Sequence, residues 1–315
     1  MDPLSDVLAL LKPRGSMSVA LDAAGDWSIE FPRWDVIRFN AVIAGHCWVA
    51  VEGVADAVHL GPGECFLLPS GRPFRVASDL DAPPVDMEAL FASKRDGVAT
   101  IHGGGEFFAV AGLFALEGDH ADVLLGVLPP IVHLRAEPDR AALRWILERL
   151  LQEQRERRPG AALVAQHLAQ VMLVQALRQY LEEGPRGGVG WLYALADPPM
   201  CAAITAIHDA PARRWTLPEL ADRAGLSRST FALRFKATVG TSPIGYLTRW
   251  RMLLAADRLA NSGEPIAAIA LSLGYESESA FSTAFKRVMG CAPRRYARGR
   301  VPTGPDRRMS QAMGT

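Results

Sequence analysis

The sequence has few cysteines and lacks long apolar runs. The four cysteines are Cys47, Cys65, Cys201 and Cys291, and no two of them form a CxxC pair. We therefore expect no structural disulfide in a reducing compartment. No apolar run reaches the roughly 18 residues that a membrane helix needs, and Asp2 and Asp6 stand where a signal peptide would carry basic groups. These absences predict a cytoplasmic protein with no membrane association.

A net charge is also absent, because 34 basic and 34 acidic residues cancel. The balance hides an uneven distribution. Residues 1–210 hold 17 Lys/Arg and 27 Asp/Glu, whereas residues 211–300 hold 15 Lys/Arg and 6 Asp/Glu. A basic C-terminal block with a net charge of +9 thus follows an acidic body of −10, which favours a polyanionic partner for that block alone. The alternative is chance clustering of solvated charge.

The length of 315 residues suits two domains. Turn residues in the first part separate short predicted strands at Val36–Ile43, Cys47–Val51, Ala57–Leu60 and Cys65–Leu68. Two further apolar segments, Phe107–Ala115 and Ala121–Leu128, can complete an antiparallel sandwich or small barrel. Helical spacing of apolar residues in 136–183 predicts two amphipathic helices, for dimerisation or for packing on the barrel. Glycine and proline at 184–190 open a predicted linker that extends to residue 200.

An internal repeat in residues 201–300 is the most informative feature of the chain. The first copy, LADRAG from Leu220 to Gly225, is followed by Phe231, Phe235, Gly240, Pro243 and Tyr246. The second copy, IALSLG from Ile269 to Gly274, is followed by Phe281, Phe285, Gly290, Pro293 and Tyr296, each fifty residues after its counterpart. In each copy a helix ends at a glycine turn and a serine caps the next helix. This order is the helix-turn-helix pattern, whose second helix enters the DNA major groove.

The segment from about 201 to 298 resembles the DNA-binding domain of the AraC/XylS family of transcriptional regulators. The resemblance rests on the strings TLPELADRAGLSRSTFALRFKATVGTSPIGYLTRWRM and PIAAIALSLGYESESAFSTAFKRVMGCAPRRY. It implies two helical subdomains joined by a long helix over about 243–262. Each subdomain would present one recognition helix to one of two successive major grooves.

The family pattern implies which residues contact DNA. Base contacts are implied for Arg228, Ser229, Ala232, Leu233, Glu278, Ser279, Ser282 and Thr283. Phosphate contacts, which position the protein without reading sequence, are implied for Arg234, Lys236, Lys286, Arg287 and Arg294. Ala232 and Leu233 can touch thymine methyl groups but cannot make bidentate hydrogen bonds. Glu278 either accepts from cytosine or stabilises the start of its own helix.

The N-terminal region resembles the cupin-like sensor domain of one branch of this family. The resemblance lies in LGPGECFLLP, from Leu60 to Pro69, and in the SGRPF that follows. The H-x-H pair of metal-binding cupins is missing, and Phe74 and Arg75 occupy the region where a further metal-binding histidine would stand. Because a catalytic metal site needs convergent ligands, we predict no metal, no cofactor and no enzymatic activity.

A pocket for a small-molecule effector inside the barrel is the leading prediction for this region. Residues that could line the pocket are Trp34, Trp48, Phe66 and Phe74, although each could equally be plain core. Cys47, beside His46, and Cys65 are candidates for redox sensing if a neighbouring cation lowers the pKa of a thiol. Buried structural cysteine is the alternative.

Together these features predict an α+β protein, with an N-terminal cupin-like antiparallel β-barrel, following helices and an all-α C-terminal domain. The predicted parts are a sensor domain at 1–135, a helical segment at 136–183, a linker at 184–200, a double helix-turn-helix domain at 201–300 and a disordered tail at 301–315. The predicted function is sequence-specific transcriptional regulation under an effector or stress signal. Expected partners are double-stranded DNA, a second copy of the chain, an unknown small molecule and RNA polymerase. The alternatives are a redox-responsive regulator, a cupin-type enzyme with a helical appendage and a constitutive architectural DNA-binding protein.

Overall fold

The computed structural model describes residues 2–12, 14–34, 36–115, 128–134, 145–146, 148–150, 152–153, 156, 158–182 and 188–299. The chain forms two compact units, one of residues 13–183 with 305–315 and the other of residues 1–12 with 184–304. The predicted tail at 301–315 and most of the predicted segment Ala121–Leu128 lie outside the described residues.

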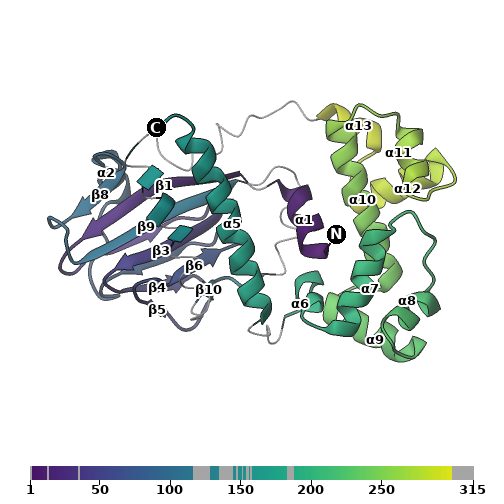
Figure 1. Ribbon diagram of the computed structural model, residues 1–315, viewed down its shortest axis with the longest axis horizontal. Helices are drawn as coiled ribbons and strands as arrows, with labels where there is room; N and C mark the ends of the chain where they lie inside the picture. Colours follow the sequence, from purple (N-terminus) through teal and green to yellow (C-terminus); the bar gives the residue numbers. More distant parts are fainter. Residues whose placement is uncertain are drawn as a thin grey trace. The chain divides into compact units, whose positions relative to one another are not determined.

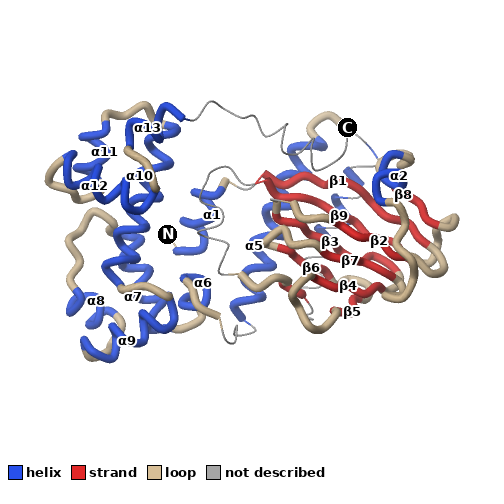
Figure 2. Tube along the Cα trace, turned by 180° about the vertical axis from the view of Figure 1, so that it is seen from behind, coloured by secondary structure: helices blue, strands red, loops and turns tan. Residues whose placement is uncertain are grey.

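The first unit is built on two β-sheets, drawn in Figures 1 and 2. The larger sheet has the order β10-β6-β3-β9-β1-β8 and the smaller the order β2-β7-β4-β5. The larger comprises β1 (Arg14–Ala23), β3 (Ile37–Ala44), β6 (Cys65–Leu68), β8 (Val98–Ile101), β9 (Phe107–Ala115) and β10 (Val132–Leu134). The smaller comprises β2 (Ser28–Phe31), β4 (Cys47–Val51), β5 (Val58–Leu60) and β7 (Phe74–Ala77). All pairs are antiparallel except β1 with β8, which run parallel and so depart from the predicted all-antiparallel barrel.

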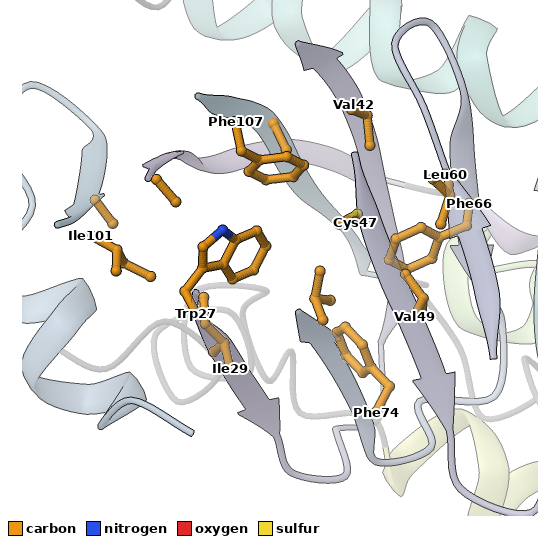
Figure 3. Packing of buried hydrophobic residues seen from close by; sticks show 14 of the residues in the cluster. Trp27, Ile29, Val42, Cys47, Val49, Leu60, Phe66, Phe74, Ile101 and Phe107 are labelled. Carbon is orange, nitrogen blue, oxygen red and sulfur yellow. The ribbon is translucent and has the colours of Figure 1, made fainter. Parts of the chain in front are cut away.

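The inner faces of both sheets supply one apolar core. Side chains alternate along β4, so that Cys47, Val49 and Val51 are buried while Trp48 points outward. Figure 3 shows Phe66, Phe74, Trp27 and Phe107 directed toward the same interior from different parts of the chain. The short helix α2 (Met87–Ala92), whose N-cap is Asp86, adds Leu90 to this core.

Helix α5 (Ala161–Glu182) packs on the larger sheet, mainly against β1. Its buried residues are Ala169, Met172, Leu173, Ala176, Leu177 and Gln179. The described residues from 145 to 156 are also helical, which agrees with the first of the two predicted helices. Several apolar side chains on these helices remain exposed, namely Trp145, Leu163, Val164 and Val171.

The second unit is helical. Its C-terminal part contains α6 (Trp191–Leu195), α7 (Pro198–Asp209), α8 (Leu217–Arg223), α9 (Arg228–Val239), α10 (Pro243–Asn261), α11 (Ile266–Ser272), α12 (Glu278–Met289) and α13 (Pro293–Gly299). Residues 191–200 were predicted as linker but form α6 and the start of α7, because Trp191, Leu192 and Met200 are buried in this unit. The helical domain therefore begins about ten residues earlier than the sequence suggested.

The sequence repeat is also a repeat in space. The rings of Phe231 and Phe235 lie 5.5 Å apart, and those of Phe281 and Phe285 lie 5.6 Å apart. A tyrosine closes each cluster edge-on, Tyr246 at 6.0 Å from Phe235 and Tyr296 at 5.5 Å from Phe285. All four phenylalanines are fully buried, as their spacing of four residues predicts. Each copy of the repeat thus builds its own small aromatic core.

Helix α1 (Pro3–Leu11) belongs to the helical unit, although the predicted boundary placed it in the sensor domain. Leu4, Val7 and Leu11 are buried, and the helix contacts α7 and α10. At its end the Lys12 ammonium lies 2.7 Å from the Asp257 carboxylate of α10. The chain therefore starts in the helical unit, passes through the β-rich unit and returns.

A buried histidine joins α1 to α7 and α10. His208 Nδ1 lies 3.1 Å from the Asp6 carboxylate and His208 Nε2 lies 2.9 Å from the Tyr246 hydroxyl. The imidazole stacks on the Trp250 ring with centroids 3.9 Å apart. Burial lowers the pKa of His208 to about 4 against the opposing pull of Asp6, so the ring is neutral at pH 7. One ring nitrogen can then donate to Asp6 while the other accepts from Tyr246.

Candidate DNA-binding interface and sensor core

Both helix-turn-helix units have the capping geometry that their sequences predict. Thr216 and Glu219 form a reciprocal capping box at the start of α8. Ser227 accepts from the backbone of Thr230 at the start of α9, and Ser277 accepts from that of Ala280 at the start of α12. The turns pass through Gly225 at φ +65° and Gly274 at φ +80°, which L residues rarely adopt.

Helix α9 presents an exposed face of mixed character. Arg228, Ser229 and Leu233 are exposed and Ala232 is half-buried. Leu233 exposes 74% of its surface. Its side chain is therefore available for an apolar contact such as a thymine methyl group.

Helix α12 presents a polar face. Glu278, Ser279 and Thr283 are exposed and Ser282 is half-buried. Glu278 occupies the first turn after the Ser277 cap, and its carboxylate lies 3.8 Å from the guanidinium of Arg294. The Thr283 hydroxyl donates to the Ser279 carbonyl over 3.0 Å. In this arrangement Thr283 presents a base with an acceptor oxygen and its methyl group.

The side chains predicted to contact phosphates differ in whether a described carboxylate already binds them. Lys236, Lys286 and Arg287 are exposed, and no described carboxylate pairs with them. Arg234 instead forms a bidentate contact with Asp197, with distances of 2.8 Å and 2.9 Å. This partner was not foreseen because Asp197 lies in the segment that was predicted as a linker. Arg234 therefore has less freedom to reach a phosphate than the other three.

The predicted pocket residues of the β-rich unit do not form one group. Phe66 and Phe74 face the inner core, with ring centroids 6.2 Å apart. Trp48 was grouped with them but is 38% exposed on the opposite face of β4, where its ring lies 4.7 Å from that of His59. Trp34 is half-buried beside Arg38, whose guanidinium lies 3.5 Å from the Trp34 ring. Trp34, Phe74 and Arg38 thus lie together at one end of the inner core, without Trp48.

The two cysteine candidates for redox sensing are both buried. Burial raises the pKa of Cys47 and of Cys65 to about 12, and the charge of Glu64 adds to the rise. His46 lies outside the strand and is exposed, whereas Cys47 points inward. A protonated, buried thiol is a poor nucleophile, so the environment of both residues argues against the redox alternative. Among the residues that the structure describes, no group of three or more His, Cys, Asp or Glu is arranged to hold a metal ion.

Two protein-family models match the chain. A family described as "Cupin" matches residues 2–182, and one described as "Helix-turn-helix domain" matches residues 220–299. The first covers the described β-sheets together with α1, and the second covers both glycine turns and the helices α9 and α12. No described helix combines the length and the apolar character that crossing a membrane requires.

Curated relatives match the chain over nearly its whole length. A putative AraC-like transcription regulator of Streptomyces antibioticus is 46% identical over 96% of this chain and 100% of its own. A protein of the same description from Streptomyces lividans is 45% identical over 97% of this chain and 100% of its own. Among solved structures, the DNA-binding domain of AdpA in complex with a target DNA is 30% identical over 34% of this chain and 99% of its own, with a TM-score of 0.32. With a cupin domain, a helix-turn-helix domain and full-length relatives of this similarity, the chain belongs to the family of AraC-like transcription regulators.

Proposed function

We propose that this regulator reads its operator with α9 and α12 and that a small molecule bound in the β-rich unit controls it. The observation that carries the DNA-reading role is the pair of capped helices, fifty residues apart, with exposed faces and exposed cations beside them. Phosphate contacts by Lys236, Lys286 and Arg287 would supply affinity, and the exposed faces would supply specificity. The chain would act in the cytoplasm, with RNA polymerase as a protein partner at its promoters.

The two classes of contact should respond differently to substitution. We expect Ser282→Ala with Thr283→Ala to lower affinity for the operator while leaving random DNA unaffected, because each base contact contributes about 1–3 kcal/mol. With the Thr283 hydroxyl donating to Ser279, we expect the lost preference to be for adenine N6 or cytosine N4, or for a thymine methyl. Lys286→Ala should weaken both DNAs alike and reduce the slope of log K against log salt by about 1. Operator fragments from genome-wide binding-site mapping, titrated at several salt concentrations, measure both effects.

Arg234→Ala is the matched control for Lys286→Ala, since Asp197 already holds that guanidinium. Its effect on the salt slope should be smaller than that of Lys286→Ala. If Ser282→Ala with Thr283→Ala lowered the affinity for operator and random DNA equally, the assignment of base contacts would be contradicted. A slope unchanged by Lys286→Ala would contradict the assignment of phosphate contacts.

Homodimerisation through α5 is a second part of this proposal. Val164 and Val171 lie seven residues apart on one face of the helix and are exposed, and Leu163 adjoins them. Apolar residues in that arrangement favour contact with a second copy. Val164→Glu with Val171→Glu should convert dimer to monomer in sedimentation of the full chain at micromolar concentration. Ala162→Glu, exposed but on the opposite side of the helix from Val171, should leave the dimer intact. A wild-type chain that sediments as a monomer would refute this part.

A further inference from the structure

Arg38 is a charged residue on the inner face of the larger sheet. It lies opposite Leu68 in the register of β3 with β6, and Leu68 belongs to the inner core. Paired residues on neighbouring strands point to the same face, so Arg38 faces inward too. Only 8% of its surface is exposed. A guanidinium in such a position normally has an acid beside it, because burying an unpaired charge is costly.

Aromatic rings surround the guanidinium of Arg38. Its Cζ atom lies 3.5 Å from the centroid of Trp34, 4.6 Å from that of Phe31 and 5.2 Å from that of Phe74. Phe31 in turn stacks on Phe74 at 4.5 Å and lies 6.1 Å from Phe91. We name these four rings, Phe31, Trp34, Phe74 and Phe91, the aromatic cage. Cation–π attraction acts through the ring faces and does not satisfy the N–H groups of the guanidinium, which still need hydrogen-bond acceptors.

The edge of the guanidinium has no acceptor among the described residues. Arg38 Nε is fully buried without a hydrogen-bond partner, and no described carboxylate forms an ion pair with the group. Arg75, thirty-seven residues later, shows the ordinary situation. It donates to the Ser28 hydroxyl and to the Ala82 carbonyl, and Glu30 lies 3.9 Å away. Burial lowers the pKa of Arg38 to about 9, which still leaves it charged at pH 7.

The cage is not fully enclosed by the rest of the unit. Phe31, Trp34 and Phe91 are half-buried, so part of each of these residues remains accessible to solvent. The Trp34 backbone N–H donates to the Gly71 carbonyl over 3.0 Å. A Cβ atom at Gly71 would come within 1.7 Å of the Trp34 carbonyl oxygen, so only glycine permits this contact. The backbone therefore holds Trp34 against Arg38.

We propose that Arg38 and the aromatic cage bind the effector, and that the effector is an organic acid with one carboxylate and a flat apolar body. A carboxylate matches the guanidinium edge through two parallel hydrogen bonds, and the four rings offer stacking surface to the rest of the molecule. A single negative charge fits because one unpaired cation lies in the cage, and a second buried negative charge would have no partner. This inference rests on the proposed control of the regulator by a small molecule and names its chemical class.

The test uses the full chain and a panel of defined probes. Benzoate, phenylacetate and indole-3-acetate are titrated by calorimetry beside benzamide and phenylacetamide, which keep the ring and lack the charge, and acetate, which keeps the charge and lacks the ring. We expect at least one aromatic acid to bind at least tenfold more tightly than its amide and than acetate. Arg38→Met should abolish that binding and Arg38→Lys should weaken it, because lysine cannot make the bidentate contact. Trp48→Phe, on the outer face, should leave it unchanged.

The thermal stability of the ligand-free variants separates a binding role from a structural one. We expect Arg38→Met to melt at the wild-type temperature or above, because it removes an unpaired buried charge. A drop of several degrees would show that the cation–π stack serves the fold and would overturn the proposal. The proposal would also be overturned if no aromatic acid bound at millimolar concentration. The same holds if the aromatic acids bound equally to the wild-type chain and to Arg38→Met. Asp35, three residues before Arg38, lies outside the described residues. If Asp35→Asn lowers the melting temperature and Arg38→Met does so equally, an internal ion pair uses the guanidinium and the proposal fails.

Footprinting of the same samples on genomic operator fragments keeps the two proposals separate. Specific footprints without any acid binding would overturn the ligand class and leave the DNA-binding function standing. Acid binding that depends on Arg38 without specific footprints would support the site and contradict the proposed function. Acid-dependent change in the footprints that disappears in Arg38→Met is the result expected if both hold.

Discussion

Replacing Val7 with aspartate is expected to loosen the helical DNA-binding unit, although Val7 lies at the far end of the sequence from the repeat. Val7 is 1% exposed in the contact of α1 with that unit. An unpaired carboxylate there would be buried beside the already acidic Asp6, at a cost of about 3 kcal/mol or more. We expect α1 to detach and hydrogen exchange to accelerate in α7 and α10, while the β-sheets exchange at the wild-type rate.

Ala9→Asp is the matched control, because Ala9 is on the same helix and exposed. It introduces the same charge at a cost of about 1 kcal/mol or less. The measurement is hydrogen exchange of the full chain, resolved by peptide. Acceleration confined to the β-rich unit would show that α1 packs there and would contradict the division of the chain described above.

The second large effect is expected at a turn. Gly274→Ala should destabilise the helical unit by about 3 kcal/mol or more, because a Cβ atom there would lie 2.1 Å from the Ala212 carbonyl oxygen. The backbone around Ala212 cannot retreat freely, since Arg251 of α10 donates to the carbonyls of Pro211 and Arg213. The Arg251 guanidinium also lies 5.6 Å from the Tyr275 ring, next to the glycine. We therefore expect the variant to lose the α11–α12 turn and with it operator binding.

Gly225→Ala provides the comparison within the same molecule. Gly225 is the equivalent glycine of the first copy and has a similar positive φ, but a Cβ atom there would meet no described atom within 4 Å. Gly225→Ala should therefore lower the free energy of unfolding only by the cost of placing alanine in the left-handed conformation, about 1–2 kcal/mol. Chemical denaturation of both variants measures the difference. If Gly274→Ala and Gly225→Ala lost the same free energy of unfolding, the contact with Ala212 would not be what holds the second turn.

The repeat and its caps were predictable because the signals are local. Ser227 and Ser277 cap helices within three residues of themselves, and the phenylalanines face inward because positions four apart share one side of a helix. The strands β4, β6 and β9 were predicted with their observed bounds, since apolar runs and turn residues mark them. The wider β-rich architecture followed from the resemblance of one short stretch around Leu60–Pro69 and was confirmed by the family match over residues 2–182.

Other features depend on contacts between residues far apart in the chain. The parallel pair β1 with β8 was not foreseen, because strand direction follows from the path of the chain between strands. Trp48 and Phe74 were grouped by residue type, but the strand register turns them to opposite faces. The groups that act on Arg234 and Cys47 likewise come from other elements. The ion pair with Asp197 restricts the Arg234 side chain. Burial and the charge of Glu64 raise the pKa of the Cys47 thiol and so lower its reactivity.

Sequence alone was sufficient to identify two helix-turn-helix units, their caps and the family, because helix periodicity, glycine turns and capping residues act over a few positions. It could not assign α1 to the DNA-binding unit, since the contact of Asp6 with His208 joins residues 202 positions apart. Nor could it show that Arg38 is buried among aromatic rings without an acid partner among the described residues. Burial and electrostatic environment are properties of the packed chain, because they depend on which distant side chains exclude water from a group.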